Sequence, residues 1–286
     1  MRLLITGAGG MLGHDLRDAA SAAGHELIAV AHDRLDITDA AAVDAAIAAG
    51  RPDVVVNCAA YTNVDGAETE DGSRLAFAVN ALGAGNVARA ASNVGAWTVH
   101  VSTDYVFDGS ASEPYVESDP VNPLSSYGRS KLAGEREVAD AAPQAHTIVR
   151  TAWLFGAFGP CFPATIMRLA AERDELSVVD DQIGSPTFTG HLAHALLALA
   201  QAQPRIVGVV HVTAAERCSW FEFAREIVAA AGLECEVMPT TTDQMARPAP
   251  RPAFSVLASE RGSATPRLPS WRDGLAQYMS LAVPAK

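Results

Sequence analysis

The 286-residue chain is short of basic residues and has no long apolar run. It carries 21 lysines and arginines against 33 acidic residues, which gives a formal net charge of −12. Because nucleic acids and anionic membrane surfaces attract basic patches, this balance argues against both as partners. A membrane-spanning helix needs about 20 consecutive apolar residues, and we find no such stretch. Because the chain as a whole is acidic, any phosphate group that binds needs hydrogen-bond donors or cations at its own site.

Cysteine is also scarce, with four residues in the chain and no CxxC pair. Since they form no dense framework, we interpret them as reduced thiols in or near the core. The first two residues lead directly into an apolar run, which leaves no room for a signal peptide. We therefore expect a soluble, cytoplasmic protein. The cysteines are Cys58, Cys161, Cys218 and Cys235.

What the chain does have is a strand-like start that runs into a glycine turn. Residues 2–6 are mainly apolar, the turn follows at residues 7–13, and an alanine-rich helical pattern continues to Gly24. Gly7, Gly10 and Gly13 permit a tight turn, close approach of a pyrophosphate and close packing of helix on strand. A glycine pattern alone is weak evidence in a chain with 22 glycines. Its place between a strand and a helix indicates dinucleotide binding.

Strands and helices alternate up to about residue 150. This pattern predicts a Rossmann-type α/β fold with a doubly wound parallel sheet, and an NAD(P)-binding domain at residues 1–150. Ligands of such sheets lie beyond the carboxyl ends of the strands, so Gly7, Ala60 and residues 102–104 should converge on one crevice. We expect strands at 26–31, 53–58, 97–102 and 146–150, and helices at 39–49, 73–93 and about 125–142.

After residue 150 the alternation loosens. Apolar helices are expected at 162–172, 192–202, 220–231 and 271–282, with a strand at 207–212 and a proline-rich loop at 247–252. We predict a smaller α/β substrate-binding lobe over residues 151–286, some segments of which return to the Rossmann domain. Such a lobe would cover the cofactor crevice and select the substrate.

Tyr127 and Lys131 lie four residues apart where a helix is expected to begin, after Pro123. Residues at this spacing leave the same helix face one turn apart, so a phenol and an ammonium are expected to meet. A free tyrosine has a pKa near ~10, and a neighbouring cation would lower it, as a proton donor that works near neutrality requires. Tyr/Lys pairs at this spacing also occur by chance on helices. Only the surrounding motifs can show whether this pair has a function.

Those motifs resemble the dTDP-4-dehydrorhamnose reductase family of the extended short-chain dehydrogenase/reductase superfamily. The glycine turn, Thr103 and the Tyr127/Lys131 pair mark the superfamily. Narrower matches span almost the whole chain, and the stretches 102–109 and 181–187 are the most specific. The other matching stretches are 57–65, 150–153, and Arg251-Pro252 with Ser255 and Leu257.

The resemblance implies NAD(P)H-dependent reduction of the C4 ketone of dTDP-4-dehydro-L-rhamnose (dTDP-6-deoxy-L-lyxo-4-hexulose) to dTDP-L-rhamnose. Hydride addition develops negative charge on the ketone oxygen, so Tyr127 would supply a proton while the Thr103 hydroxyl polarises the same oxygen. Lys131 would hold the nicotinamide ribose and lower the pKa of Tyr127. Asp104, as a hydrogen-bond acceptor, and Trp153, as an apolar wall, would lie beside the sugar.

The diphosphate of the substrate and the cofactor also need binding residues. Arginine suits a diphosphate because its planar fork is bidentate, and among Arg168, Arg217, Arg247 and Arg251 we favour Arg251 in the matched C-terminal motif. Cofactor contacts are expected from the glycine turn, the loops after the second and third strands, and the Tyr/Lys pair. These residues are Gly7, Gly10, Met11, Leu12, Gly13, Arg34, Asp36, Ile37, Ala59, Ala60, Tyr61, Tyr127 and Lys131.

The choice of nicotinamide depends on residues 31–36, at the end of the second strand. An acidic residue there bonds the ribose 2′-hydroxyl of NAD, whereas a basic residue accepts the 2′-phosphate of NADP. The resemblance places Asp36 at the adenine end, which leaves His32 and Arg34 near the 2′ position. We predict that both cofactors work and that NADPH is preferred by a factor on the order of ten. The alternative is that Asp33 sets the choice.

Other interpretations stay open for three site residues: Thr103 as a turn cap, Asp104 as the acceptor of an Asx-turn, and Trp153 as ordinary core. Some family members bind a divalent cation between subunits, partly through a glutamate of the first helix. Asp15 lies there but is shorter, so we predict no metal site and a monomer or weak homodimer. The histidines show no ligand spacing and are interpreted as structural or surface residues. They are His14, His100, His191, His194 and His211.

Two rival functions remain. A nucleotide-sugar epimerase or dehydratase shares the fold and the Tyr/Lys pair but recycles its cofactor, so stoichiometric loss of NAD(P)H distinguishes the two. Relatives of these reductases also serve as non-catalytic, nucleotide-binding regulatory subunits of another enzyme. Retention of Thr103, Tyr127 and Lys131 together argues against that role.

Overall fold

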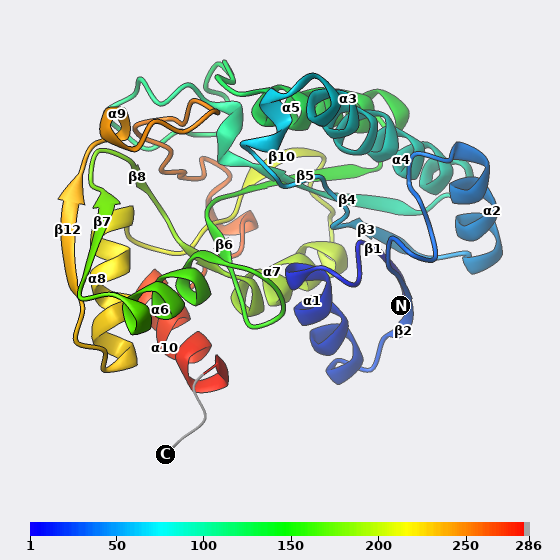
Figure 1. Ribbon diagram of the computed structural model, residues 1–286. Coiled ribbons are helices and arrows are strands. Elements are labelled where there is room, and N and C mark those ends of the chain that lie inside the picture. Colours follow the sequence, from blue (N-terminus) through cyan, green and yellow to red (C-terminus); the bar gives the residue numbers. More distant parts are fainter. Residues whose placement is uncertain (283–286) are drawn as a thin grey trace.

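Six parallel strands form the central sheet of the computed structural model, which describes residues 1–282 (Figure 1). Every neighbouring pair in the sheet is parallel. The chain reverses its direction across the sheet between β1 and β3, and open sheets bind ligands beside such a switch point. The predicted doubly wound, Rossmann-type sheet is confirmed. The strand order is β10 (Gly208–His211), β5 (His146–Thr151), β4 (Trp97–Thr103), β3 (Val54–Asn57), β1 (Arg2–Thr6) and β2 (Glu26–Val30).

Helices cover both faces of the sheet, as buried parallel strands require (Figure 1). On one face α1 (Met11–Ala22) and α7 (Thr189–Gln201) share a core with Leu3 and Ile5 of β1. On the other face Leu4 of β1 packs with α2 and α4, and α4 packs with α5. Because neighbouring residues of a strand point to opposite sides, the apolar run of β1 supplies both cores. The bounds of this second layer are α2 (Ala40–Gly50), α4 (Ala84–Asn93) and α5 (Ser126–Ala141).

The long helix expected at residues 73–93 has three parts. The first part, α3 (Glu70–Phe77), begins earlier than predicted because Thr69 Oγ1 accepts the N–H of Gly72 at 3.1 Å and caps the helix. A π-helical segment, η2 (Ala78–Gly83), follows and leads into α4. Such segments inside helices often mark functional sites, and this one carries the buried Asn80.

Residues after 151 build a second core of their own. It gathers apolar side chains from α6 (Phe162–Glu172), α8 (Trp220–Ala231) and α10 (Trp271–Ala282). Beside it, β7 (Glu175–Val179) pairs in parallel with β12 (Glu236–Thr240). The strand predicted at 207–212 is β10, which pairs with β5, so this segment and α7 return to the central sheet.

Within residues 1–282, every helix is too short or too polar to cross a membrane. Short elements connect the layers described above. The remaining elements are β6 (Leu154–Phe155), β8 (Ile183–Gly184), β9 (Thr187–Phe188), β11 (Cys218–Ser219), α9 (Thr242–Met245) and the 3₁₀ turns η1 (Gly66–Glu68), η3 (Asp104–Val106) and η4 (Gly262–Ala264).

Candidate active site

The glycine turn lies beside the switch point, between β1 and α1. Gly7 has a φ of +67°, and a Cβ at this position would lie 2.5 Å from the backbone nitrogen of Ala59. A Cβ on Gly13 would lie 2.2 Å from the carbonyl oxygen of Gly7. Both positions therefore require glycine. The N-cap residue of α1 is Gly10, which has no side chain to accept from the first turn, so the N–H groups of that turn are available to a phosphate.

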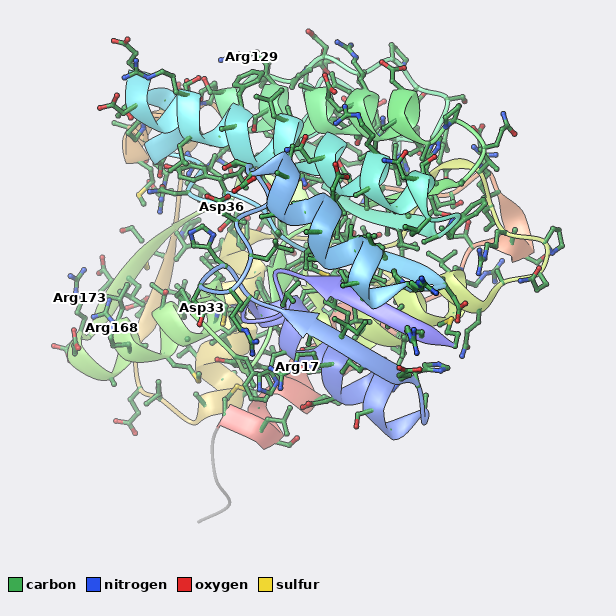
Figure 2. All side chains as sticks on the ribbon, turned by 90° about the vertical axis from the view of Figure 1, so that its right-hand side faces the viewer. Arg17, Asp33, Asp36, Arg129, Arg168 and Arg173 are labelled. Atoms are coloured by element: carbon green, nitrogen blue, oxygen red, sulfur yellow. The ribbon has the colours of Figure 1, made fainter. Side chains whose placement is uncertain are left out.

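The loop after β2 exposes charges of both signs. Asp36 Oδ1 accepts hydrogen bonds from the backbone nitrogen and Oγ1 of Thr38 at 2.9 and 2.8 Å, and these bonds lower its pKa. Ile37 is buried beside it, while Arg34 is exposed. Figure 2 shows Asp33 and Asp36 on this loop. Asp36 is thus held in a turn of its own loop, and its expected contact with the cofactor stays a prediction.

The loop after β3 is held against the glycine turn by Asn57. Its Oδ1 accepts hydrogen bonds from Thr6 Oγ1 at 2.7 Å and from the backbone nitrogen of Ala59 at 3.1 Å. Since Thr6 ends β1 and Asn57 ends β3, these bonds lie at the carboxyl ends of the two strands. They bring Ala59 and Gly7 together, as the sequence predicts for a shared crevice.

Asn80 ties this loop to the helix that carries the Tyr/Lys pair, and sequence reasoning missed it. Its Oδ1 accepts from the backbone nitrogen of Tyr61 at 2.8 Å, and its Nδ2 donates to the Tyr61 carbonyl at 3.1 Å. Nδ2 also donates to Ser130 Oγ at 2.9 Å, between Tyr127 and Lys131 in the sequence. The sequence feature that could have revealed Asn80 is its place as a lone asparagine in an apolar helical stretch, because a buried amide needs hydrogen-bond partners.

Tyr127 and Lys131 lie in the first turns of α5, as predicted. Lys131 is 2% exposed, its Nζ donates to the Val101 carbonyl at 2.7 Å, and burial lowers its pKa to about 8. Burial raises the pKa of Tyr127 and the Asp104 carboxylate raises it further, whereas a hydrogen bond with Thr103 lowers it. Lys131 is not among the described residues that shift this pKa. The pKa of Tyr127 is therefore raised on balance, and its lowering by Lys131 stays a prediction.

Thr103 and Asp104 meet at the end of β4. Thr103 Oγ1 accepts from the backbone nitrogen of Tyr105 at 3.1 Å and donates to Asp104 Oδ1 at 2.9 Å. Thr103 therefore caps the turn η3, one of the interpretations left open, and its proton points at Asp104. Burial raises the pKa of Asp104 to about 7, although polar contacts with Ser255 and Thr103 lower it.

Trp153 follows β5 in a left-handed conformation, with a φ of +48°. Its ring stacks on that of Trp220, with centroids 3.6 Å apart. Gly184 lies against the same indole, since a Cβ there would come within 2.3 Å of it. The side chain is partly exposed, so Trp153 is not ordinary core. Backbone strain of this kind is concentrated at functional sites.

Arg251 has a carboxylate partner, Asp65, in the loop after β3. Its Nη1 and Nη2 donate to the two Asp65 oxygens at 2.9 Å each, and Nη1 also donates to the Ala249 carbonyl at 2.8 Å. Arg247 lies 3.4 Å from the same carboxylate. The side chain of Arg251 is 13% exposed and that of Arg247 is 55% exposed. Arg251 fixes the loop, and Arg247 has the freer guanidinium.

The other two candidate arginines are engaged elsewhere. Arg168 lies on the surface of α6 near Arg173 (Figure 2), where it pairs with Glu172 at 3.3 Å. Arg217 lies over the ring of Phe254 at 5.7 Å from the centroid. Arg251 and Arg247 therefore remain the arginines nearest to the Tyr105 and Tyr127 end of the site, since both lower the pKa of Tyr105.

Two matched stretches far apart in the sequence pair with each other. Ile183 donates its N–H to the Ala253 carbonyl, and Ser255 donates its N–H to the Ile183 carbonyl, both at 2.8 Å. Ser255 in turn contacts Asp104.

Within residues 1–282, no three histidine, cysteine, aspartate or glutamate side chains gather in a way that could hold a metal ion.

Comparisons with known proteins place the whole chain in one family. The family model described as RmlD substrate binding domain matches residues 1–283. A dTDP-4-dehydrorhamnose reductase of Mycolicibacterium smegmatis is 45% identical over 291 residues, which cover 99% of this chain and 86% of that protein. The structure of a dTDP-4-dehydrorhamnose reductase from Clostridium acetobutylicum has a TM-score of 0.94 and 42% identity, covering 98% of this chain and 99% of that one.

A second solved structure, of the dTDP-4-dehydrorhamnose reductase from Bacillus anthracis, is a complex with NADP. It has a TM-score of 0.92 and 39% identity, and covers 97% of this chain and 98% of that one. These matches agree with the glycine turn, the Tyr/Lys pair and the paired stretches described above. The chain therefore belongs to the dTDP-4-dehydrorhamnose reductase family of the extended short-chain dehydrogenase/reductase superfamily.

Proposed function

We propose that the protein reduces the C4 ketone of dTDP-4-dehydro-L-rhamnose to dTDP-L-rhamnose, with NADPH as the preferred reductant and NADH as an alternative. The observation that carries the proposal is the cluster of Thr103, Asp104 and Tyr127 at the end of β4. Their hydroxyl and carboxyl groups meet where parallel sheets bind ligands, on the same edge as the glycine turn.

The glycine turn fits a dinucleotide. A Cβ at Gly7 or Gly13 would collide with backbone, and the first-turn N–H groups of α1 suit a pyrophosphate. Residues 59–61 would line the nicotinamide end, and Lys131 has ammonium protons beyond the one given to Val101 for the ribose hydroxyls. The reduced nicotinamide, when bound, supplies the hydride.

Proton supply falls to Tyr127. The phenol is protonated at neutral pH and would donate its proton to the ketone oxygen. Thr103 lowers the pKa of the same phenol, and its hydroxyl would polarise that oxygen. Lys131 is largely charged at neutral pH, since its pKa is about 8, and would stabilise the negative charge left behind.

The sugar nucleotide would bind between the Trp153/Trp220 stack and the loop 247–251. The stacked indoles offer an apolar wall to the 6-deoxy sugar. Arg247, more exposed than Arg251, would meet the diphosphate, while Arg251 keeps the loop in place through Asp65. The overall charge of −12 makes such a local cationic site necessary.

The test is to incubate the purified protein with NADPH and dTDP-4-dehydro-L-rhamnose, follow the loss of NADPH absorbance and identify the product. We expect dTDP-L-rhamnose and one NADPH consumed per product. Conversion of the sugar without net NADPH loss would indicate an epimerase or dehydratase. No turnover, together with a tight stoichiometric enzyme partner, would indicate a regulatory subunit.

We also propose a cytoplasmic location and a monomer or weak homodimer. All four cysteines are free thiols, which suits a reducing compartment. Light scattering at increasing protein concentration measures the oligomeric state, and a concentration-independent dimer mass would contradict the proposal.

A further inference from the structure

The Thr103 hydroxyl has one proton, and Asp104 competes for it with any bound ketone. Oγ1 already accepts from the Tyr105 backbone nitrogen, and it lies 2.9 Å from Asp104 Oδ1. An ionised carboxylate only accepts hydrogen bonds, so the Thr103 proton must then point at Oδ1. A carboxyl that carries a proton on Oδ1 donates to Oγ1 instead, and this releases the Thr103 proton for another acceptor.

Burial favours the form of Asp104 that carries the proton, although polar contacts with Ser255, Thr103 and the backbone of residues 104 and 105 favour the ionised form. Asp104 is 2% exposed, and its Oδ2 is buried without a hydrogen-bond partner within residues 1–282. The titratable and polar groups that face it are Tyr127 from α5, Tyr105 from its own turn and Ser255 from the C-terminal stretch. None of these groups is a cation. The nearby guanidinium of Arg251 is paired with Asp65.

We propose that Asp104 is a positioning residue whose protonation state decides where the Thr103 hydroxyl donates. With Asp104 protonated, Thr103 donates to the ketone oxygen; with Asp104 ionised, Thr103 donates to the carboxylate and the ketone loses a donor. The inference rests on the proposed function, because it assumes that the ketone lies at Thr103 and Tyr127. Only the Tyr127 proton leaves the protein, and those of Thr103 and Asp104 change direction without being consumed.

Ionisation of Asp104 also slows the reaction through Tyr127. The charge of ionised Asp104 raises the pKa of Tyr127 and so makes the phenol a weaker proton donor. Reduction should therefore slow as Asp104 ionises, which burial places near neutral pH, at a pKa of about 7. Lys131, with a pKa of about 8, titrates close to this range, and the variants below separate the two groups.

The experiment measures single-turnover oxidation of NADPH by the 4-keto sugar nucleotide from about pH 5.5 to about pH 9. Since ionised Asp104 leaves the ketone with one donor fewer, the wild-type rate should fall above the pKa of Asp104 and level off near the rate of Thr103→Val. Asp104→Asn cannot ionise and keeps an N–H donor for Thr103, so its rate, whatever its size, should not fall near pH 7, and a fall that sets in only near pH 8 would belong to Lys131. Thr103→Val should be slow throughout. Asp140→Asn, an exposed aspartate near the end of α5, should keep the wild-type profile.

Infrared spectra of the wild type give a test that needs no variant. A protonated-carboxyl band should disappear over the pH range in which the rate falls. A wild-type rate that is independent of pH, or an Asp104→Asn rate that falls as the wild type does, would overturn the inference. A wild type that reduces no ketone at any pH would instead refute the proposed function.

Discussion

Burial sets the acid–base character of single residues in this site. Removal from water disfavours the charged form, so it raises the pKa values of Tyr127 and Asp104 and lowers that of Lys131. Tyr127 and Asp104 thereby keep their protons to a higher pH than they would in water. A ketone that gains negative charge on its oxygen needs donors of this kind.

The direct test of the proton donor is Tyr127→Phe. Loss of a positioned general acid should lower the turnover number by ~10² or more, while NADPH affinity, which depends on the glycine turn, stays within about threefold. Single-turnover kinetics and a fluorescence titration with NADPH measure the two quantities. Tyr105→Phe is the matched control, because its ring lies edge-on to Tyr127 at 6.0 Å. Near-normal turnover of Tyr127→Phe would refute the assignment.

Arg34 tests the choice of cofactor. We expect the wild type to prefer NADPH by about tenfold in catalytic efficiency, equivalent to ~1.4 kcal/mol, which one exposed charge contact could supply. Arg34→Ala should abolish most of this preference, and Arg168→Ala, on the surface of α6, should leave it intact. Comparison of kcat/KM for NADPH and NADH measures the effect. A wild type that prefers NADH, or an unchanged ratio in Arg34→Ala, would mean that Asp33 sets the choice.

At the scale of secondary-structure elements, the π-helical segment η2 joins two parts of the site. It interrupts the helix between α3 and α4 and presents Asn80 to Tyr61 and to Ser130 of α5. The loop after β3 and the helix α5 are thus connected by one buried amide. Glu68 adds a second connection, because its Oε1 accepts from the Ser126 backbone nitrogen at 2.7 Å at the start of α5.

Asn80→Ala should weaken both the fold and cofactor binding. It leaves buried partners of Tyr61 and Ser130 unsatisfied, so the free energy of unfolding should fall by about 1–3 kcal/mol. The KM for NADPH should rise, since residues 59–61 lose their anchor. Urea unfolding and steady-state kinetics measure the two effects. Asn93→Ala, at the exposed end of α4, should change neither, and an Asn80→Ala variant as stable as this control would contradict the prediction.

At the scale of the whole molecule, contacts between distant segments complete the site. Asp65, in the loop after β3, holds Arg251 and Arg247, and the hydrogen bond with Arg251 is the main cause of its lowered pKa. A buried pair, Glu135 and Arg150 at 2.7 Å, joins α5 to β5. The members of each pair are far apart in the sequence, so neither pair could be predicted from residue spacing.

Asp65→Asn should loosen the loop 247–251 without touching the reacting groups. Loss of the bidentate charge pair should raise the KM for the sugar nucleotide about tenfold, with a smaller change in kcat. Amide hydrogen exchange should accelerate in residues 247–253. Asp71→Asn, an exposed aspartate in α3, is the control. Unchanged exchange in this loop would show that Asp65 does not hold it.

The sequence by itself determined the features that depend on near neighbours in the chain. The periodicity of apolar residues predicted the alternating strands and helices, and the glycine turn predicted the phosphate-binding start of α1. The spacing of Tyr127 and Lys131 placed both on one face of α5. Helix starts were displaced by a few residues, as at α3, because a capping side chain such as Thr69 decides where a helix begins.

Only the tertiary structure decided which hydrogen-bond and charge partners each site residue has, and how far each is exposed to water. Tyr127 was expected to have a lowered pKa because Lys131 is one turn away, but burial and Asp104 of η3 raise it. Arg251 was expected to bind the diphosphate, but it forms a bidentate pair with Asp65. Asn80 was missed because its partners come from a loop and from α5. Desolvation and hydrogen bonding depend on residues brought together by folding, and spacing along the chain does not contain that information.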